Sequence, residues 1–232
     1  MYDSEPCIFQ RYCPEATVVF KAPKGRIIFM LDQEVRFIYH VHEGVVCGVR
    51  TTEQGHEMTD LSVPPLLIGV LGFMDMYTNK RRLHLAEARA MTPVVYCKVR
   101  REAVWDIMDD RKARAEIIHL ICKGALYKGM LNASPVKTDI ANRILYVLQI
   151  LTRSVGKKGS DGAIFISDIS HEDIASLANS TRPTVTRIFK KLERSGLITI
   201  NRRQLIILDP IGLLNLSQYN PAISNAANID IQ

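Results

Sequence analysis

The stretch ISHEDIASLANSTRPTVTRIFKKLERSGLI, residues 169–198, decides the fold of the C-terminal part of the chain. A helix is expected to begin at Ser170, because a serine side chain can accept a backbone N–H there and an acidic residue, Asp173, follows three positions later. After a short Asn-Ser-Thr turn, a second helix is expected to open with Thr181 as its cap and Pro183 in its first turn, where proline is tolerated. The pattern therefore predicts two helices joined by a tight turn.

The second helix has one apolar face and one basic face. Its apolar stripe consists of Val185, Ile188, Phe189 and Leu192. The opposite face, at positions i, i+3, i+4, i+7 and i+11, carries Pro183, Thr186, Arg187, Lys190 and Arg194. Two β-type runs, 197–200 and 205–208, then flank Arg202 and Arg203 and predict a hairpin with both arginines at its tip. Together these features indicate a winged helix-turn-helix, and a helical hairpin used only for packing is the alternative.

A helix of this kind fits the major groove of DNA with its N-terminal residues facing the base edges. Arginine can bind guanine O6 and N7 with two donors at once, and threonine can contact a phosphate or a thymine methyl. We expect base contacts from four residues: Arg182, Thr184, Thr186 and Arg187. Contacts to phosphates give affinity without sequence information. We expect them from six residues: Ser180, Lys190, Lys191, Arg194, Arg202 and Arg203.

The sequence of residues 14–99 has a different pattern, with short runs of β-forming residues separated by glycine and polar residues. The runs that we expect to form strands are 17–20, 26–30, 36–41, 45–49 and 93–99. Short strands at a spacing of roughly 8–12 residues indicate an antiparallel sandwich or barrel.

In the next segment, 101–132, apolar residues recur at three- and four-residue steps and predict one long helix, which Pro135 ends or kinks. A small barrel cannot cover the whole apolar stripe, so a helix from a second copy is a natural partner, and packing within the chain is the alternative. We expect three segments: a β domain at 1–100, the long helix at 101–134 and a DNA-binding domain at 135–232.

Just before the helix-turn-helix, a helix at 140–154 and a strand at 163–166 are expected to flank a loop at 156–162.

Composition excludes several classes of protein. With 47% hydrophobic residues over 232 positions, the chain is too apolar for a disordered tail. No apolar run approaches the ~18–20 residues of a membrane span, and the acidic start is not that of a signal peptide. The net charge of +6 permits a nucleic-acid partner without demanding one. Five scattered cysteines suit reduced thiols, so we expect a cytoplasmic protein with no membrane partner.

Residues 169–188 and 192–198 closely resemble the winged helix-turn-helix of the cyclic AMP receptor protein and fumarate–nitrate reduction regulator (Crp/Fnr) family. The N-terminal half is similar to that family's effector-binding jelly-roll, so the resemblance spans about residues 15–210. It implies an α+β protein with an N-terminal antiparallel β jelly-roll, a long dimerisation helix and a C-terminal winged helix-turn-helix. It also implies a homodimeric, effector-responsive transcription regulator, not an enzyme. We expect an activator that binds a palindromic operator and works with RNA polymerase.

Within the family, the motif at 181–187 looks most like the cyanobacterial nitrogen-control regulators, although Pro183 stands where many members have a base-reading glutamate. Cyclic-nucleotide binders have a Gly-Glu pair for the ribose and an Arg-Ser pair for the phosphate. Here these positions read Gly69-Val70 and, approximately, His84-Leu85. Valine cannot accept a hydrogen bond from a ribose, so a cyclic nucleotide is not the expected effector.

The segment that ends at Leu71 instead resembles the part of the nitrogen-control regulators that binds 2-oxoglutarate. The charged residues that those proteins place on the long helix align with Gly124 and Gly129, and Lys123 and Lys128 stand beside these positions. Regulators of halorespiration in the same family read a phenolic ligand partly through this helix. We expect a small organic anion, such as 2-oxoglutarate, at Gly69, Val70, Leu71, Arg81, Arg82, His84, Lys123, Tyr127 and Lys128.

Other chemistries remain as alternatives. An iron–sulfur cluster needs four well-placed thiolates, and Cys7 and Cys13 have no tight cysteine cluster after them. A Cys7–Cys13 disulfide would make a redox-switched regulator. His40 and His42 alternate on one strand face and could bind a metal or haem, or be ordinary barrel residues. That His-x-His pair is also the only hint of a metal-dependent cupin-type enzyme. A last alternative is an interaction module that no longer binds DNA.

Overall fold

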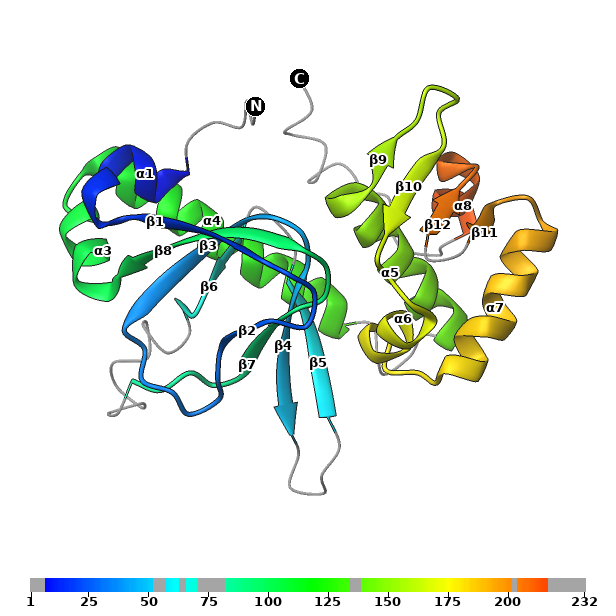
Figure 1. The fold of residues 1–232 in the computed structure, drawn as a ribbon, viewed down its shortest axis with the longest axis horizontal. Helices are drawn as coiled ribbons and strands as arrows, with labels where there is room; N and C mark the ends of the chain where they lie inside the picture. Colours follow the sequence, from blue (N-terminus) through cyan, green and yellow to red (C-terminus); the bar gives the residue numbers. More distant parts are fainter. Residues whose placement is uncertain are drawn as a thin grey trace. The chain divides into compact units, whose positions relative to one another are not determined.

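A computed structural model describes residues 7–51, 57–62, 66–70, 82–133, 139–201 and 204–216. The chain divides into two compact units, residues 1–134 and 135–232, which are described separately below (Figure 1). Among the described residues, no helix is long and apolar enough to cross a membrane.

The first unit is built on two four-stranded antiparallel sheets. One has the order β1-β8-β3-β6 and the other β2-β7-β4-β5. The strands are β1 (Val18–Ala22), β2 (Ile27–Phe29), β3 (Phe37–Glu43), β4 (Val46–Thr51), β5 (Glu57–Ser62), β6 (Leu66–Ile68), β7 (Glu87–Ala90) and β8 (Val94–Arg100). Both sheets contribute to one apolar core, with Tyr39 and Ile68 from the first and Phe29 and Ala88 from the second. The predicted antiparallel sandwich is therefore confirmed.

All five predicted strand runs form strands, but the sequence pattern missed β5, β6 and β7. Strand β7 shows the reason. Its sequence, Glu-Ala-Arg-Ala, contains no β-branched or aromatic residue, yet Ala88 and Ala90 are buried and alternate with Glu87 and Arg89. These two charged side chains form an ion pair of 2.5 Å outside the core. Pairing with β2 and β4 keeps this segment extended in spite of its composition.

Helices cover the outer face of the β1-β8-β3-β6 sheet. They are α1 (Ile8–Tyr12), a 3₁₀ turn η1 (Pro14–Ala16), α3 (Arg101–Ile107) and α4 (Arg111–Ala133). Phe9, Val104 and Ile117 pack with Ile38 and Val99 of the sheet in a second apolar core. The sandwich thus has one core between its sheets and another beneath its helices.

The prediction of one continuous helix over 101–132 is wrong. The helix is interrupted between Ile107 and Arg111, and the carboxylate of Asp110 accepts the backbone N–H groups of Lys112 and Ala113, both at 2.8 Å. Asp110 therefore acts as an N-cap, and α4 begins there as a new helix. Residues 109–112 are all charged, so the apolar steps stop at the break, and the prediction of one helix overlooked this local signal.

The second unit consists of α5 (Ile140–Val155), a four-stranded sheet, and helices α6 (His171–Leu177), α7 (Arg182–Arg194) and α8 (Pro210–Leu216). The sheet has the order β11-β12-β10-β9, from β9 (Lys157–Lys158), β10 (Ile164–Ser167), β11 (Ile198–Asn201) and β12 (Gln204–Ile207). The segment 156–162, predicted as a loop, contains β9, where Lys158 pairs with Ile164. The α+β class and the predicted order of helix, turn, helix and hairpin are confirmed.

Candidate nucleic-acid interface

Helix α6 begins with the predicted capping box. The backbone N–H of Asp173 donates to Oγ of Ser170 at 3.1 Å, and the backbone N–H of Ser170 donates to Oδ2 of Asp173 at 2.6 Å. Helix α7 begins after Thr181, as predicted, but no side chain caps it. Instead, the hydroxyl of Thr181 pairs with that of Thr184 at 3.0 Å. Thr181 is therefore the N-cap residue of α7, as predicted, without a side-chain hydrogen bond to the helix backbone.

One face of α7 is buried, so only the opposite face is accessible to a ligand. Val185, Ile188, Phe189 and Leu192 are all buried against the rest of the unit. His171 of α6 lies with its ring edge against the ring of Phe189, at a centroid distance of 4.9 Å, and its Nδ1 is 2.9 Å from Oγ1 of Thr186. Burial and the nearby charge of Arg182 lower the pKa of His171, so its neutral form is favoured. These contacts hold α6 and α7 as one unit.

The opposite face of α7 is basic and open to solvent. A shallow hollow on it is lined by Arg182, Pro183, Thr186, Arg187, Lys190, Lys191 and Arg194. All five cationic residues of this set are exposed. A row of cations on one exposed helix face, with no acidic residue lining the hollow, can bind a polyanion such as the DNA backbone. We call this surface the basic face of α7.

The polar residues predicted to contact DNA have different environments. The hydroxyl of Thr186 donates to the carbonyl of Arg182 at 3.0 Å and contacts His171, so its methyl group is the part free for a ligand. The hydroxyl of Ser180 is buried and has no hydrogen-bond partner among the described residues. Arg202 and Arg203 lie outside the described residues. They connect Asn201 and Gln204, which are paired in the hairpin.

The structure brings together two residues of the predicted effector site. Gly69 follows β6 with a φ of +83°, and a Cβ there would lie 3.1 Å from Cε1 of His84. His84 is 2% exposed, and its ring stacks on Phe29 at 3.7 Å. Burial lowers the pKa of His84 to about 4, so the residue is neutral near pH 7 and supplies no positive charge.

The structure describes only some of the other predicted effector residues. Val70 packs against the apolar core beneath the helices, and Arg82 is exposed. Lys123 is half-buried on α4, beside Gly124, where a Cβ would overlap Cδ1 of Leu66, so α4 lies close to β6. Leu71 and Arg81 lie outside the described residues, as do the side chains of Tyr127 and Lys128.

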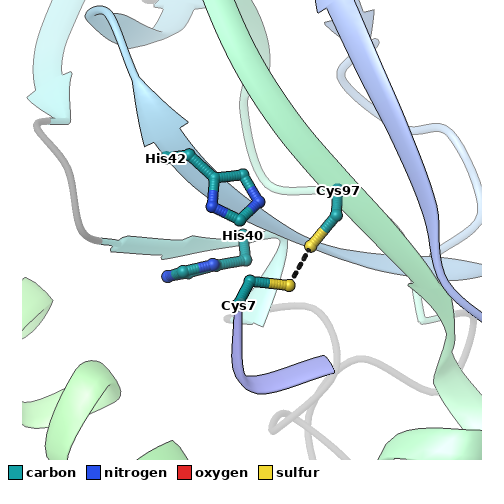
Figure 2. Close-up of side chains that lie close together, drawn as sticks. All are labelled: Cys7, His40, His42 and Cys97. Atoms are coloured by element: carbon teal, nitrogen blue, oxygen red, sulfur yellow. Dashed lines mark hydrogen bonds between the residues drawn. The ribbon is translucent and has the colours of Figure 1, made fainter. Parts of the chain in front are cut away.

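The sequence also suggested two separate features that the structure places together. Cys7 does not pair with Cys13. Its sulfur lies 2.8 Å from that of Cys97, whereas the thiol of Cys13 lies 3.6 Å from the hydroxyl of Thr17. The side chains of His40 and His42 lie beside Cys7 and Cys97 (Figure 2). The pairing of β3 with β8 brings His40 beside Cys97, and α1 brings Cys7 to the same place, whereas no short spacing in the sequence joins these residues.

Comparisons with known proteins place both units among known domains. The family model described as Crp-like helix-turn-helix domain matches residues 140–216, and the model described as Cyclic nucleotide-binding domain matches residues 19–111. The global nitrogen regulator of Synechococcus elongatus is 28% identical over 191 residues, which cover 82% of this chain and 85% of that relative. The anaerobic regulatory protein of Pasteurella multocida is 22% identical, over 84% of this chain and 70% of its own length.

Solved structures show the same fold. A CRP-family transcriptional regulator from Thermus thermophilus superposes with a TM-score of 0.70 at 23% identity, covering 84% of this chain and 95% of that one. FixK2 from Bradyrhizobium japonicum superposes with a TM-score of 0.71 at 17% identity, covering 88% and 98%. At these identities, the two structures support the fold and nothing finer.

Proposed function

This chain belongs to the Crp/Fnr family of DNA-binding transcription regulators, and from that premise we propose that it reads a palindromic operator as a homodimer. The basic face of α7 carries this proposal, because its cations are exposed while the opposite face is buried. We assign base reading to Arg182 and Arg187, near the start of α7, where a recognition helix faces the base edges. Thr184 and Thr186 contribute apolar contacts to thymine methyl groups.

Phosphate binding belongs to the later part of α7 and to the hairpin. Lys190, Lys191 and Arg194 follow Arg187 along the same helix, all exposed. Arg202 and Arg203 would extend the contact from the hairpin tip, and Ser180 would join only after its buried hydroxyl is uncovered. These contacts supply affinity that depends on salt and not on sequence.

The exposed side of α4 supports dimerisation through this helix. Its buried side, with Ala113 and Ile117, packs on the sheet. A second row of apolar or small residues, exposed in the single chain, consists of Ala115, Ile118, Cys122 and Ala125. Their spacing of three, four and three residues is that of a helix–helix seam between two chains. In this proposal, residues 1–100 sense the effector, 101–134 join the protomers and 135–232 bind DNA.

The effector in this proposal is a small organic anion, bound between the β domain and α4. Gly69-Val70 lacks the carboxylate that would hold a ribose, which argues against a cyclic nucleotide. Arg82 and Lys123 would supply the positive charge, while neutral His84 would serve as a hydrogen-bonding group. An effector can shift DNA binding only to the extent that it binds one arrangement of the two DNA-binding domains more tightly than the other. As an activator, the bound dimer would recruit RNA polymerase.

Selection of bound duplexes from a random DNA pool, with and without 2-oxoglutarate, tests the proposal. Enrichment of a palindrome only with the ligand would support both DNA reading and the effector class. A palindrome in both arms would support the regulator and reject 2-oxoglutarate as a required effector. Enrichment without twofold symmetry would contradict the proposed dimer. If Arg82→Ala and Lys123→Ala left ligand-dependent binding unchanged, the proposed anion site would be wrong.

A further inference from the structure

Four side chains of types that can bind a metal ion come from three separate segments and lie together on the outer face of the β1-β8-β3-β6 sheet (Figure 2). They are Cys7 at the start of α1, His40 and His42 on β3, and Cys97 on β8. One ligand atom from each residue lies within 4.8 Å of the others. The group therefore has the compactness of a site for one ion.

The two strands place three of these side chains. His40 and Cys97 are paired residues of β3 and β8, so their side chains share one face of the sheet. His42 stands two residues after His40, at a register shift between Val41 and Glu43. A local irregularity of this kind re-aims a side chain relative to a regular strand. The rings of the two histidines lie edge to face, 4.7 Å apart.

The N-terminal segment brings the fourth ligand. Cys7 caps α1, and the backbone N–H of Gln10 donates to its sulfur at 3.4 Å while the Gln10 side chain accepts from the Cys7 backbone N–H at 3.1 Å. This reciprocal cap fixes the direction of the Cys7 side chain. Its sulfur lies 2.8 Å from that of Cys97, close enough for both thiols to reach one ion.

Three members of the group are buried, and ring nitrogens of both histidines lack a hydrogen-bond partner among the described residues. Cys7 is 4% exposed, Cys97 is 0% exposed and His40 is 7% exposed. Both ring nitrogens of His40 and Nε2 of His42 are buried without a hydrogen-bond partner among the described residues. A buried polar atom without a hydrogen-bond partner destabilises the fold, so such an arrangement calls for a ligand. An ion would bind one nitrogen of each ring.

We propose that Cys7, His40, His42 and Cys97 form a tetrahedral site for one divalent metal ion, with Zn²⁺ as the metal. Two thiolates and two imidazoles are an established donor set for Zn²⁺. Ordinary Zn–S and Zn–N bonds place tetrahedral ligand atoms about 3.3–3.8 Å apart. All four ligand atoms lie within 4.8 Å of one another, and the two sulfurs, 2.8 Å apart here, would separate by about 1 Å on binding the ion. A two-iron cluster with the same donors would hold the thiolates and the imidazoles on different irons and needs a wider group.

The site goes beyond the proposed function and does not depend on DNA binding. It would join α1 to β3 and β8. Helix α1 also contacts α4, because Arg11 forms an ion pair with Glu116 and the hydroxyl of Tyr12 donates to the same carboxylate at 3.3 Å. The metal would therefore hold the N-terminal segment between the sheet and α4.

Metal analysis of the full-length protein tests the site directly. The protein is purified under anaerobic, reducing conditions, its metal content is measured, and the stripped protein is titrated with Co²⁺. We expect one metal ion per chain, and a Co²⁺ spectrum with thiolate charge-transfer and tetrahedral d–d bands that Zn²⁺ abolishes. X-ray absorption of the zinc form should show two sulfur and two nitrogen ligands. This measurement on the unaltered chain does not depend on the folding of any variant.

Variants then assign the ligands. Cys7→Ser should lower the charge-transfer intensity of bound Co²⁺ by about half, because one of two thiolates is lost, and His42→Asn should weaken Co²⁺ binding. Matched controls are Cys13→Ser in the same N-terminal segment and His119→Asn on the exposed side of α4, which should leave the spectrum unchanged. Failure of the reduced, folded chain to bind Co²⁺, an unchanged spectrum in both ligand variants, or acid-labile sulfide in the purified protein would each overturn the proposal.

Discussion

Two residues on the basic face of α7, Arg187 and Lys190, are predicted to affect DNA binding in different ways when each is replaced. Both residues are exposed and stand one turn apart on the same face. In our account Arg187 reads a guanine, whereas Lys190 binds a phosphate. Replacing each with alanine should therefore produce different losses, although each removes one positive charge per protomer.

The expected magnitudes follow from the contacts and from twofold symmetry. A bidentate arginine–guanine contact is worth about 1–3 kcal/mol, so losing one per half-site should cost about 2–6 kcal/mol per dimer. That cost raises Kd on the selected operator by about 30-fold to about 10⁴-fold. Lys190→Ala removes two phosphate contacts per dimer and should make the negative slope of log K against log salt shallower by about 1.8.

Fluorescence anisotropy on the selected operator and on a scrambled duplex, at several salt concentrations, measures both effects. Arg187→Ala should lose much more affinity on the operator than on scrambled DNA and should relax base preference at one position of each half-site. Lys190→Ala should weaken both duplexes alike and should lose less affinity than the unaltered protein as salt rises. An equal loss on both duplexes for Arg187→Ala would refute its assignment as a base reader.

Three further predictions concern the rest of the chain. Ser170→Ala should lower the free energy of unfolding by about 0.5–2 kcal/mol in urea titrations, because it removes the cap of α6; an unchanged midpoint would count against this. If the proposed dimer forms through α4, Ile118→Asp should make the protein monomeric in sedimentation velocity, whereas Ile211→Asp, at an exposed residue of α8, should not. The pKa of His84 is about 4 in the folded chain against about 6.5 unfolded. The unfolded state therefore binds the proton first, and stability should fall as pH drops from about 6.5 to about 4. His84→Gln should flatten this dependence, and an equally steep curve would exclude His84 as its source.

The DNA-binding unit could be predicted closely because its signals are local. Ser170 and Asp173 stand three residues apart and form the cap that the sequence indicated. The apolar stripe of α7 follows helical spacing, so its burial also defined the basic face. What could not be predicted was where hydroxyls point: Thr186 bonds Arg182 and His171, and that contact depends on how α6 packs on α7.

The first unit was less predictable because its decisive contacts are long-range. Strand β7 is extended only through pairing with neighbours far along the chain. The break at Asp110 is an exception, because the charged run at 109–112 is a local signal that the prediction overlooked. Cys7 and Cys97 are 90 residues apart in sequence, and strand pairing alone brings His40 beside Cys97. The sequence contained both the thiols and the His-x-His pair, without a spacing that joined them.

The central claim, that α7 reads bases through Arg187, is tested most directly by a cycle that combines a protein change with a DNA change. The guanine assigned to Arg187 in the selected operator is replaced by 7-deazaguanine, which lacks the N7 acceptor. The account predicts that this replacement weakens binding of the unaltered protein but causes no further loss in Arg187→Ala, because the contact is already absent. Independent, additive losses would contradict it.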